Sequence, residues 1–175
     1  MRTAAPSSAA WAGAAALCFH IGTATAQPSP RGCTAVPRPN PPGQTLVCAD
    51  GLTVATEAGS DVRLVDRDRD GRPEKAELVD RGLLVESPAG TPRPFQILTP
   101  HAIASVRGTI WAVDVSAERT SVFVQRGAVS VRRQRGRGVV LRAGEGVDVN
   151  AAGGALEVKR WSPERASALL ARFGR

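Results

Sequence analysis

The residues best suited to chemistry in this 175-residue chain are acidic side chains within one short charged segment. Three aspartates alternate with arginines, a glycine follows, and a glutamate stands six residues later: Asp66, Asp68, Asp70, Gly71 and Glu77. This spacing fits the D-x-D-x-D-G-x5-E pattern of a calcium-binding loop, in which alternate carboxylates converge on the ion and the last glutamate ligates through both oxygens. The sequence therefore offers Asp66, Asp68, Asp70 and Glu77 as a weak Ca²⁺ site.

The same segment has a second interpretation, a charged β-hairpin turn that holds no ion. The arginines between the aspartates lower the local negative potential, and Pro73 stands where an EF-hand packs a β-branched residue. A strand-like run, not an amphipathic helix, precedes Asp66. Asp70-Gly71 would then supply the turn of the hairpin. Both interpretations stay open, and no other cofactor is expected.

Nothing else in the sequence assembles a catalytic site. Beyond the first 26 residues His101 is the only histidine, and no serine lies in a G-x-S-x-G setting. No glycine-rich phosphate loop ends in Lys-Ser or Lys-Thr. The basic segment 133–138 (RQRGRG) could hold phosphate or sulfate, or form the tip of a hairpin. We predict that the protein is not an enzyme.

The N-terminus has the three parts of a cleavable signal peptide. Arg2 supplies positive charge, residues 9–21 form an apolar run, and Ala24-Thr25-Ala26 is an A-x-A cleavage signal. The apolar run is too short for a membrane span, which needs about 20 residues. We therefore predict a periplasmic protein that has no transmembrane span and whose mature form begins at Gln27.

Export also bears on the oxidation state of the cysteines. Cys18 would leave with the signal peptide, so Cys33 and Cys48 would remain as an even pair in an oxidising compartment. We predict a disulfide between them, with free thiols as the alternative.

The elements that position these residues are mostly short β-strands. Apolar runs rich in branched residues and separated by Gly and Pro predict strands at residues 45–48, 52–56, 62–65, 77–79, 83–86, 95–98, 110–115, 120–125, 129–132, 139–142, 147–149 and 155–160. Ile103 and Val106 are interpreted as short inward-pointing anchors. Ser162 and Pro163 begin the single clear helix, which Gly174 ends.

This pattern predicts an all-β fold, a short-stranded β-roll or sandwich with a solenoid as an alternative, and one C-terminal α-helix. Four segments are predicted: signal peptide 1–26, a proline-rich extended arm 27–49 carrying the disulfide, a β domain 50–150, and a last strand with an amphipathic helix 151–175. The helix would dock through one apolar face formed by Ala166, Leu169, Leu170 and Phe173.

The stretch from Phe95 to Val115 resembles the core of a FecR-type domain. The resemblance rests on Thr99-Pro100, then Val106-Arg107-Gly108-Thr109 and the alternating run Ile110–Val115. It continues in the glycine-punctuated strands up to Gly144-Glu145, and it spans residues 50–149. Within it, Thr99, Pro100, Arg107, Gly108 and Thr109 are predicted to be structural turn residues.

The resemblance implies a periplasmic, non-enzymatic β module that takes part in envelope signalling. In the family's signalling members this domain follows a membrane span and a cytoplasmic anti-sigma segment, and neither is found in this sequence. We therefore expect a protein-binding sensor or adaptor. The net charge of +7 suggests an alternative, a module that binds envelope polysaccharide or peptidoglycan through its Arg-rich loops. Nucleic acid is not an expected partner of an exported chain.

Overall fold

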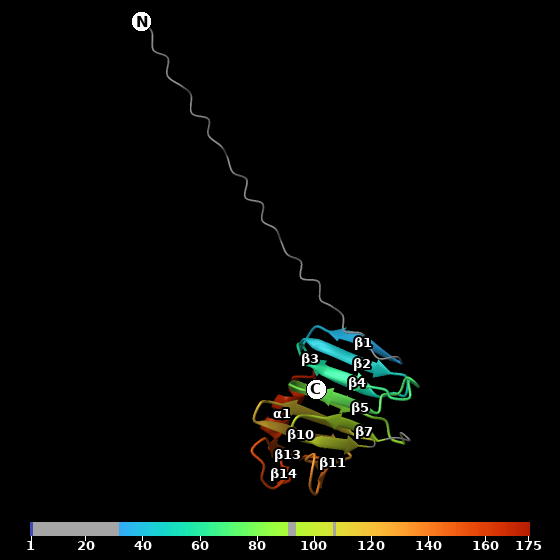
Figure 1. Ribbon diagram of the computed structural model, residues 1–175, viewed down its shortest axis with the longest axis vertical. Helices are drawn as coiled ribbons and strands as arrows, with labels where there is room; N and C mark the ends of the chain where they lie inside the picture. Colours follow the sequence, from blue (N-terminus) through green and yellow to red (C-terminus); the bar gives the residue numbers. More distant parts are fainter. Residues whose placement is uncertain (2–31, 91–93, 107) are drawn as a thin grey trace.

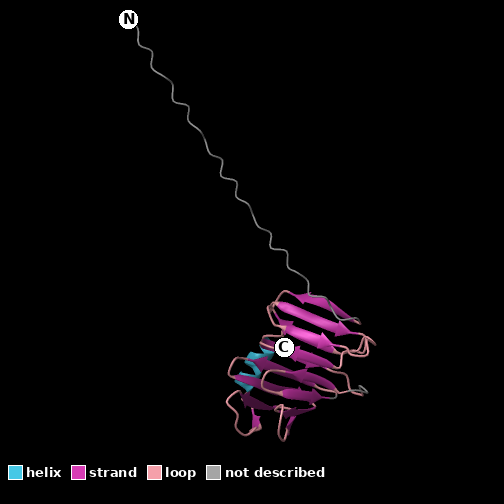
Figure 2. Ribbon diagram, viewed as in Figure 1, coloured by secondary structure: helices cyan, strands magenta, loops and turns pink. Residues whose placement is uncertain are grey.

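The computed structural model describes Met1 and residues 32–90, 94–106 and 108–175, and the signal-peptide prediction lies outside these residues. Two antiparallel-rich sheets lie face to face, and a short helix packs at one side of the pair (Figures 1 and 2). The predicted all-β fold with one C-terminal helix is confirmed as a two-sheet sandwich.

The eight-stranded sheet has the order β1-β2-β3-β6-β9-β10-β13-β14. Its strands are β1 (Cys33–Arg38), β2 (Gly43–Cys48), β3 (Thr53–Glu57), β6 (Arg81–Glu86), β9 (Ile110–Val115), β10 (Arg119–Arg126), β13 (Glu145–Asn150) and β14 (Lys159–Arg160). The six-stranded sheet has the order β12-β11-β8-β7-β5-β4. Its strands are β4 (Val62–Val65), β5 (Lys75–Leu78), β7 (Phe95–Leu98), β8 (Ile103–Val106), β11 (Ala128–Arg132) and β12 (Val139–Arg142).

Two local predictions need correction. The segment 103–106 is a full strand, and Ile103 faces away from the core because it pairs with Leu98 while Ala104 and Val106 point inward. The proline-rich segment enters the sheet only at its edge, where Cys33–Arg38 pairs with β2. An edge strand tolerates Pro37, whose missing N–H would be costly in a central strand. The last strand covers only Lys159–Arg160.

The core lies between the sheets and is filled by small branched side chains. The inward residues of every long strand alternate with outward ones, as expected when one face of a sheet is buried. Trp111, fully buried, is the largest of them. The same core cluster holds aliphatic side chains from both sheets, among them Val85, Val113, Val124 and Ile97. This core explains how a chain with few aromatic residues still builds a sandwich.

The helix α1 (Pro163–Ala171) covers the outer face of the eight-stranded sheet. Ser162 caps it by accepting a hydrogen bond from the Arg165 N–H, and Pro163 occupies the first turn as predicted. Its apolar face and Trp161 pack against outward side chains of the sheet: Ala55, Leu84, Ile110, Ala112 and Phe123. The ring of Trp161 stacks on Phe123 at 5.1 Å between centroids.

A charged clasp fixes the C-terminal end of the helix to the same sheet. The Arg172 guanidinium donates to both oxygens of Glu57 at 2.7 Å and to Asp114 Oδ1 at 2.7 Å. The Gly82 N–H also donates to Glu57. Hydrogen bonding to Arg172 holds the pKa of Glu57 below its ordinary value, despite partial burial. We refer to Arg172, Glu57 and Asp114 as the Arg172 clasp.

Within the described part of the chain, no helix is long and apolar enough to cross a membrane.

Candidate functional site

The acidic segment forms the loop of the β4–β5 hairpin, and only part of the predicted calcium set converges there. Carboxylate oxygens of Asp66, Asp68 and Glu74 lie within 4.8 Å of one another. Glu74 was not in the predicted set. Glu77 lies on β5, where Arg63 and Lys75 bind its carboxylate, the latter at 2.9 Å. These two cations lower the pKa of Glu77, Arg63 most.

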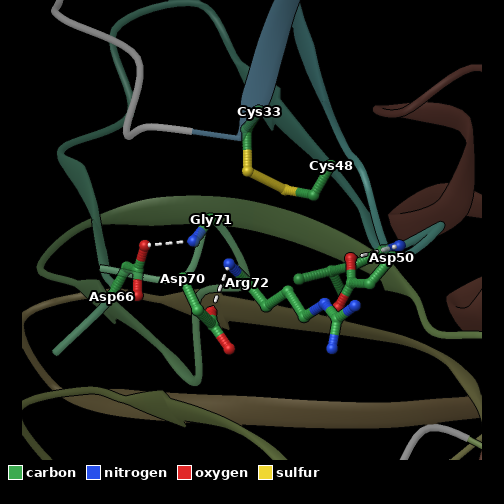
Figure 3. Close-up of a disulfide and its surroundings, with 8 residues drawn as sticks. Cys33, Cys48, Asp50, Asp66, Asp70, Gly71 and Arg72 are labelled. Carbon is green, nitrogen blue, oxygen red and sulfur yellow. Dashed lines mark hydrogen bonds between the residues drawn. A yellow bond between two sulfur atoms is a disulfide. The ribbon is translucent and has the colours of Figure 1, made fainter. Parts of the chain in front are cut away.

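Hydrogen bonds to the backbone shape this loop as a turn. Asp66 accepts from the Gly71 N–H at 2.9 Å, and Asp70 accepts from the Arg72 N–H at 2.9 Å (Figure 3). Gly71 has a φ of 83°, which a glycine adopts without strain. The hairpin-turn interpretation therefore describes the geometry of the loop, and Asp70-Gly71 lies at its turn.

The loop packs against the start of β1, beside the disulfide. Cys33 and Cys48 are direct partners in the β1–β2 register and are bonded to each other (Figure 3). At Gly32 a Cβ would meet the Gly71 carbonyl oxygen at 2.2 Å, so the two glycine backbones touch. The disulfide therefore holds the strand against which the acidic loop rests.

The predicted calcium site has a direct test. A Ca²⁺ ion takes six to eight oxygen ligands, and three converging carboxylates supply only part of such a shell. Binding would raise the melting temperature, roughly with the logarithm of the ion concentration above the Kd, and Asp66→Asn would remove that rise. Thermal melts with and without Ca²⁺ measure it, with Mg²⁺ and the variant Asp61→Asn as controls. An unchanged melting temperature at millimolar Ca²⁺ would leave the loop as a structural turn.

A cavity of about 330 Å³ opens beside the same loop. Its apolar walls come mainly from Leu52, Pro73, Pro88 and Phe95, and Glu74 lies at its border. A small cavity with mainly apolar walls therefore lies next to the converging carboxylates.

The turn residues of the family-like stretch are packed tightly. Gly108 has a φ of 63°, and a Cβ there would lie 3.0 Å from Ala89 Cα. Thr109 is fully buried, and among the residues that the structure describes its hydroxyl has no hydrogen-bond partner. Arg107 lies outside the described residues.

Gly108→Val should destabilise the fold by about 1–3 kcal/mol. The left-handed backbone strains any β-branched residue, and the added side chain meets Ala89. Chemical denaturation of the wild type and the variant measures the difference, with Gly136→Val as a control. A Cβ on Gly136 meets no atom within 4 Å, although its φ is also positive, so the control isolates the clash. Equal losses in both variants would assign the effect to the backbone alone.

Thr99 and Pro100 form the second predicted turn, and its polar groups are paired. The buried Thr99 hydroxyl lies 2.8 Å from the Thr120 hydroxyl, and it accepts from the Ala102 N–H at 2.9 Å. His101 Nδ1 lies 3.2 Å from the same Thr120 hydroxyl. These contacts join the β7–β8 turn to the start of β10, so we assign Thr99 and His101 a structural role.

A second polar cluster, formed by Asp148, Ser121 and Arg165, lies at the opposite end of the helix from the clasp, and we call it the polar ledge. Asp148 on β13 accepts hydrogen bonds from Ser121 and Arg165, both at 2.6 Å. Burial raises the pKa of Asp148, but these two donors outweigh it and leave the pKa below its ordinary value. The Arg165 guanidinium lies 3.6 Å from the centre of the Trp161 ring. The ledge borders a hollow of about 430 Å³ with mixed charges, and its contacts hold the helix on the sheet.

The outer face of the six-stranded sheet is covered by no element that the structure describes. The register places the following residues on it: Arg63 and Val65 of β4, Lys75 and Glu77 of β5, Gln96 and Leu98 of β7, Ile103 and Ser105 of β8, Ser130 and Arg132 of β11, and Val140 and Arg142 of β12. We call this set the open face. Each of these side chains is half-buried or exposed, as expected for a sheet face in solvent.

Sequence reasoning missed the open face. The strands themselves were predicted, but the alternation of a strand does not tell which outer face a helix will cover. One signal was present: residues 119–142 contain seven arginines and no aspartate or glutamate.

The comparisons with known proteins agree with this architecture. Two crystal structures described as a "putative anti-sigma factor" from Parabacteroides distasonis ATCC 8503 are similar, each with a TM-score of 0.61 and 20% sequence identity. The similarity covers 79% and 78% of this chain and 64% of each of those chains, so this chain spans less than two thirds of their length. The comparison with curated proteins gave no match.

The family comparison covers the strands that build both sheets. The model of the FecR protein family matches residues 43–130, which run from the first residue of β2 into β11. That segment is half of the chain and includes the turns at Thr99-Pro100 and Gly108-Thr109. The chain belongs to the FecR protein family.

Proposed function

We propose that this protein is a non-catalytic, periplasmic binding module that takes part in envelope signalling by binding a protein partner. The observation that supports it best is the open face, a sheet surface that no described element covers, whereas α1 packs on the outer face of the other sheet. Four of its six strands lie wholly inside the segment that the family model matches, and β11 lies partly inside it.

The composition of the open face suits a protein partner. Half-buried apolar side chains, Leu98 and Ile103 in the middle, alternate with charged and polar ones toward both edges. Protein interfaces combine an apolar centre with a polar rim in this way. The similarity to a protein described as an anti-sigma factor favours a regulatory partner, and the disulfide favours an oxidising compartment.

Photo-crosslinking in cells tests the proposal. A photoreactive amino acid replaces Ser130, which is exposed on the open face, and in a matched strain it replaces Ser167, which is exposed on the helix. We expect a discrete adduct with one envelope protein from position 130 and none from position 167. Discrete adducts at neither position, together with co-sedimentation of the protein with purified cell wall, would favour the polysaccharide-binding alternative.

A further inference from the structure

We propose that the arginine-bearing end of the open face, β11 and β12, binds an extended acidic segment of the protein partner in which acidic and apolar side chains alternate along one face of the segment. This inference rests on the proposed function and specifies where the partner binds and with which chemistry.

The register of the β11–β12 hairpin spaces two arginines for such a segment. Arg142 lies opposite Ala128, and Arg132 lies four residues further along β11 on the same face. Four residues of strand span about 13 Å. Ser130 and its partner Val140 lie between the two guanidinium-bearing positions. An extended chain laid along the hairpin would meet positive charge, an apolar patch, and positive charge again.

β11 and β12 contain no acidic residue, and Glu145, which follows β12, binds the backbone N–H of Arg142. Arg132 donates to the backbone carbonyls of Arg133 and Gln134, both at 3.2 Å. Arg135 and Arg137, both exposed, extend the charge into the hairpin loop. At the other end of the open face, Glu77 pairs with both Arg63 and Lys75 and offsets one of their two positive charges. The open face is therefore more positive at β11 and β12 than at β4 and β5.

The apolar position and the free edge favour a polypeptide over a uniform polyanion. Val140 is 59% exposed, the highest value of the exposed valines. β12 is an edge strand, hydrogen-bonded to β11 on one side only. On its free side the Arg142 N–H donates to the Glu145 side chain, so the alternate Val140 N–H also faces that edge. A partner strand could use this edge and cover Val140, whereas a polysaccharide chain would leave the valine exposed.

A binding experiment with defined probes tests the inference. The first probe, the Glu-Val peptide, is a synthetic peptide of about ten residues in which every second residue is alternately glutamate and valine, with serine between them, so that both types lie on one face of the extended chain. The second replaces glutamate by lysine, and the third and fourth are polyglutamate and polygalacturonate. Backbone amide NMR of the purified protein locates each probe, and titration gives Kd. We expect the Glu-Val peptide to shift signals of β11, β12 and β8, with affinity that falls as salt rises, and the Lys-Val peptide to leave them unchanged.

Matched variants distinguish binding at Arg132 and Arg142 from a general effect of the protein's net charge. The double variant R132E/R142E should weaken the Glu-Val peptide by at least about tenfold. R67E/R119E changes the net charge equally but lies outside the open face, and it should weaken binding by less than about twofold. R132Q/R142Q removes charge without repulsion, so it keeps the test valid should the reversal variant fail to fold. Val140→Ser should weaken the peptide but leave polyglutamate unaffected.

Three outcomes would overturn the inference. These are absence of peptide binding, equal loss in both reversal variants, and polyglutamate or polygalacturonate binding as tightly as the peptide. The cellular crosslink distinguishes this failure from failure of the proposed function. A discrete protein adduct that persists in R132E/R142E would keep the proposed function and reject this location and chemistry. Loss of the adduct in that variant, but not in R67E/R119E, would support both.

Discussion

Arg172→Ala should lower the free energy of unfolding by about 2–3 kcal/mol, because the substitution leaves two partly buried carboxylates without their cation. The side chain of Arg172 is about one-third exposed and that of Glu57 less, so the loss is smaller than the 3–5 kcal/mol of a fully buried pair. Denaturation followed by tryptophan fluorescence measures it, since Trp161 stacks beside the helix.

The contribution of the clasp should depend on pH in a definite direction. Hydrogen bonding to Arg172 lowers the pKa of Glu57 in the folded protein, so the unfolded chain takes up the proton first as pH falls. The stabilisation is fully present above the ordinary pKa of Glu57, about 4.5, and is lost as pH falls through the lower folded value. The difference between wild type and Arg172→Ala should therefore be constant near neutrality and shrink in acid.

Two further variants test the assignment. Glu57→Gln with Arg172→Ala should cost less than the sum of the two single changes, since both remove the same contact. Arg175→Ala is the matched control, because Arg175 pairs with the more exposed Glu86 and should cost less than about 1 kcal/mol. Equal effects of Arg172→Ala and Arg175→Ala, or a pH-independent difference, would contradict the clasp.

Removing the Cys33–Cys48 disulfide should cost about 3 kcal/mol in the chain-entropy account of a loop of about 15 residues. For a chain of this size such a loss lowers the melting temperature by about 6–12 °C. The variant C33A/C48A isolates the bond, and calorimetry measures the shift.

Reduction provides the control for this prediction. A reducing agent should lower the melting temperature of the wild type toward that of C33A/C48A and leave the double variant unchanged. Two titratable thiols in protein purified from an oxidising compartment, or equal melting temperatures of wild type and C33A/C48A, would show that the bond does not stabilise the native protein.

The sequence alone determined the class of fold and much of its detail. Alternating apolar residues, such as those of Ile110–Val115, predict strands because a sheet buries one face of each strand and exposes the other. Ser162 and Pro163 predict the start of the helix because both satisfy local backbone requirements of a first turn. The disulfide followed from an even pair of cysteines, and the structure confirms it.

Only the tertiary structure decided which charged residues meet. Glu57 and Arg172 are 115 residues apart, and no local pattern indicates that helix docking will join them. In the acidic loop the motif predicted Asp66, Asp68, Asp70 and Glu77. The structure brings together the carboxylates of Asp66 and Asp68, with Glu74 as the third. Glu77 belongs to β5 and therefore projects onto the open face toward Arg63, as strand alternation requires.

The open face itself is a property of the assembled sheets. Each strand has an outward side, and the sequence marks those sides as polar or mixed. One helix can cover only one outer face. The apolar face of α1 packs on the eight-stranded sheet, because that sheet has apolar side chains such as Ala112 and Phe123 on its outer surface. The other sheet keeps Arg132 and Arg142 in solvent, because no segment of matching apolar character in the described chain packs over them. Local propensity fixed the strands, and long-range packing decided which surface remained available for a partner.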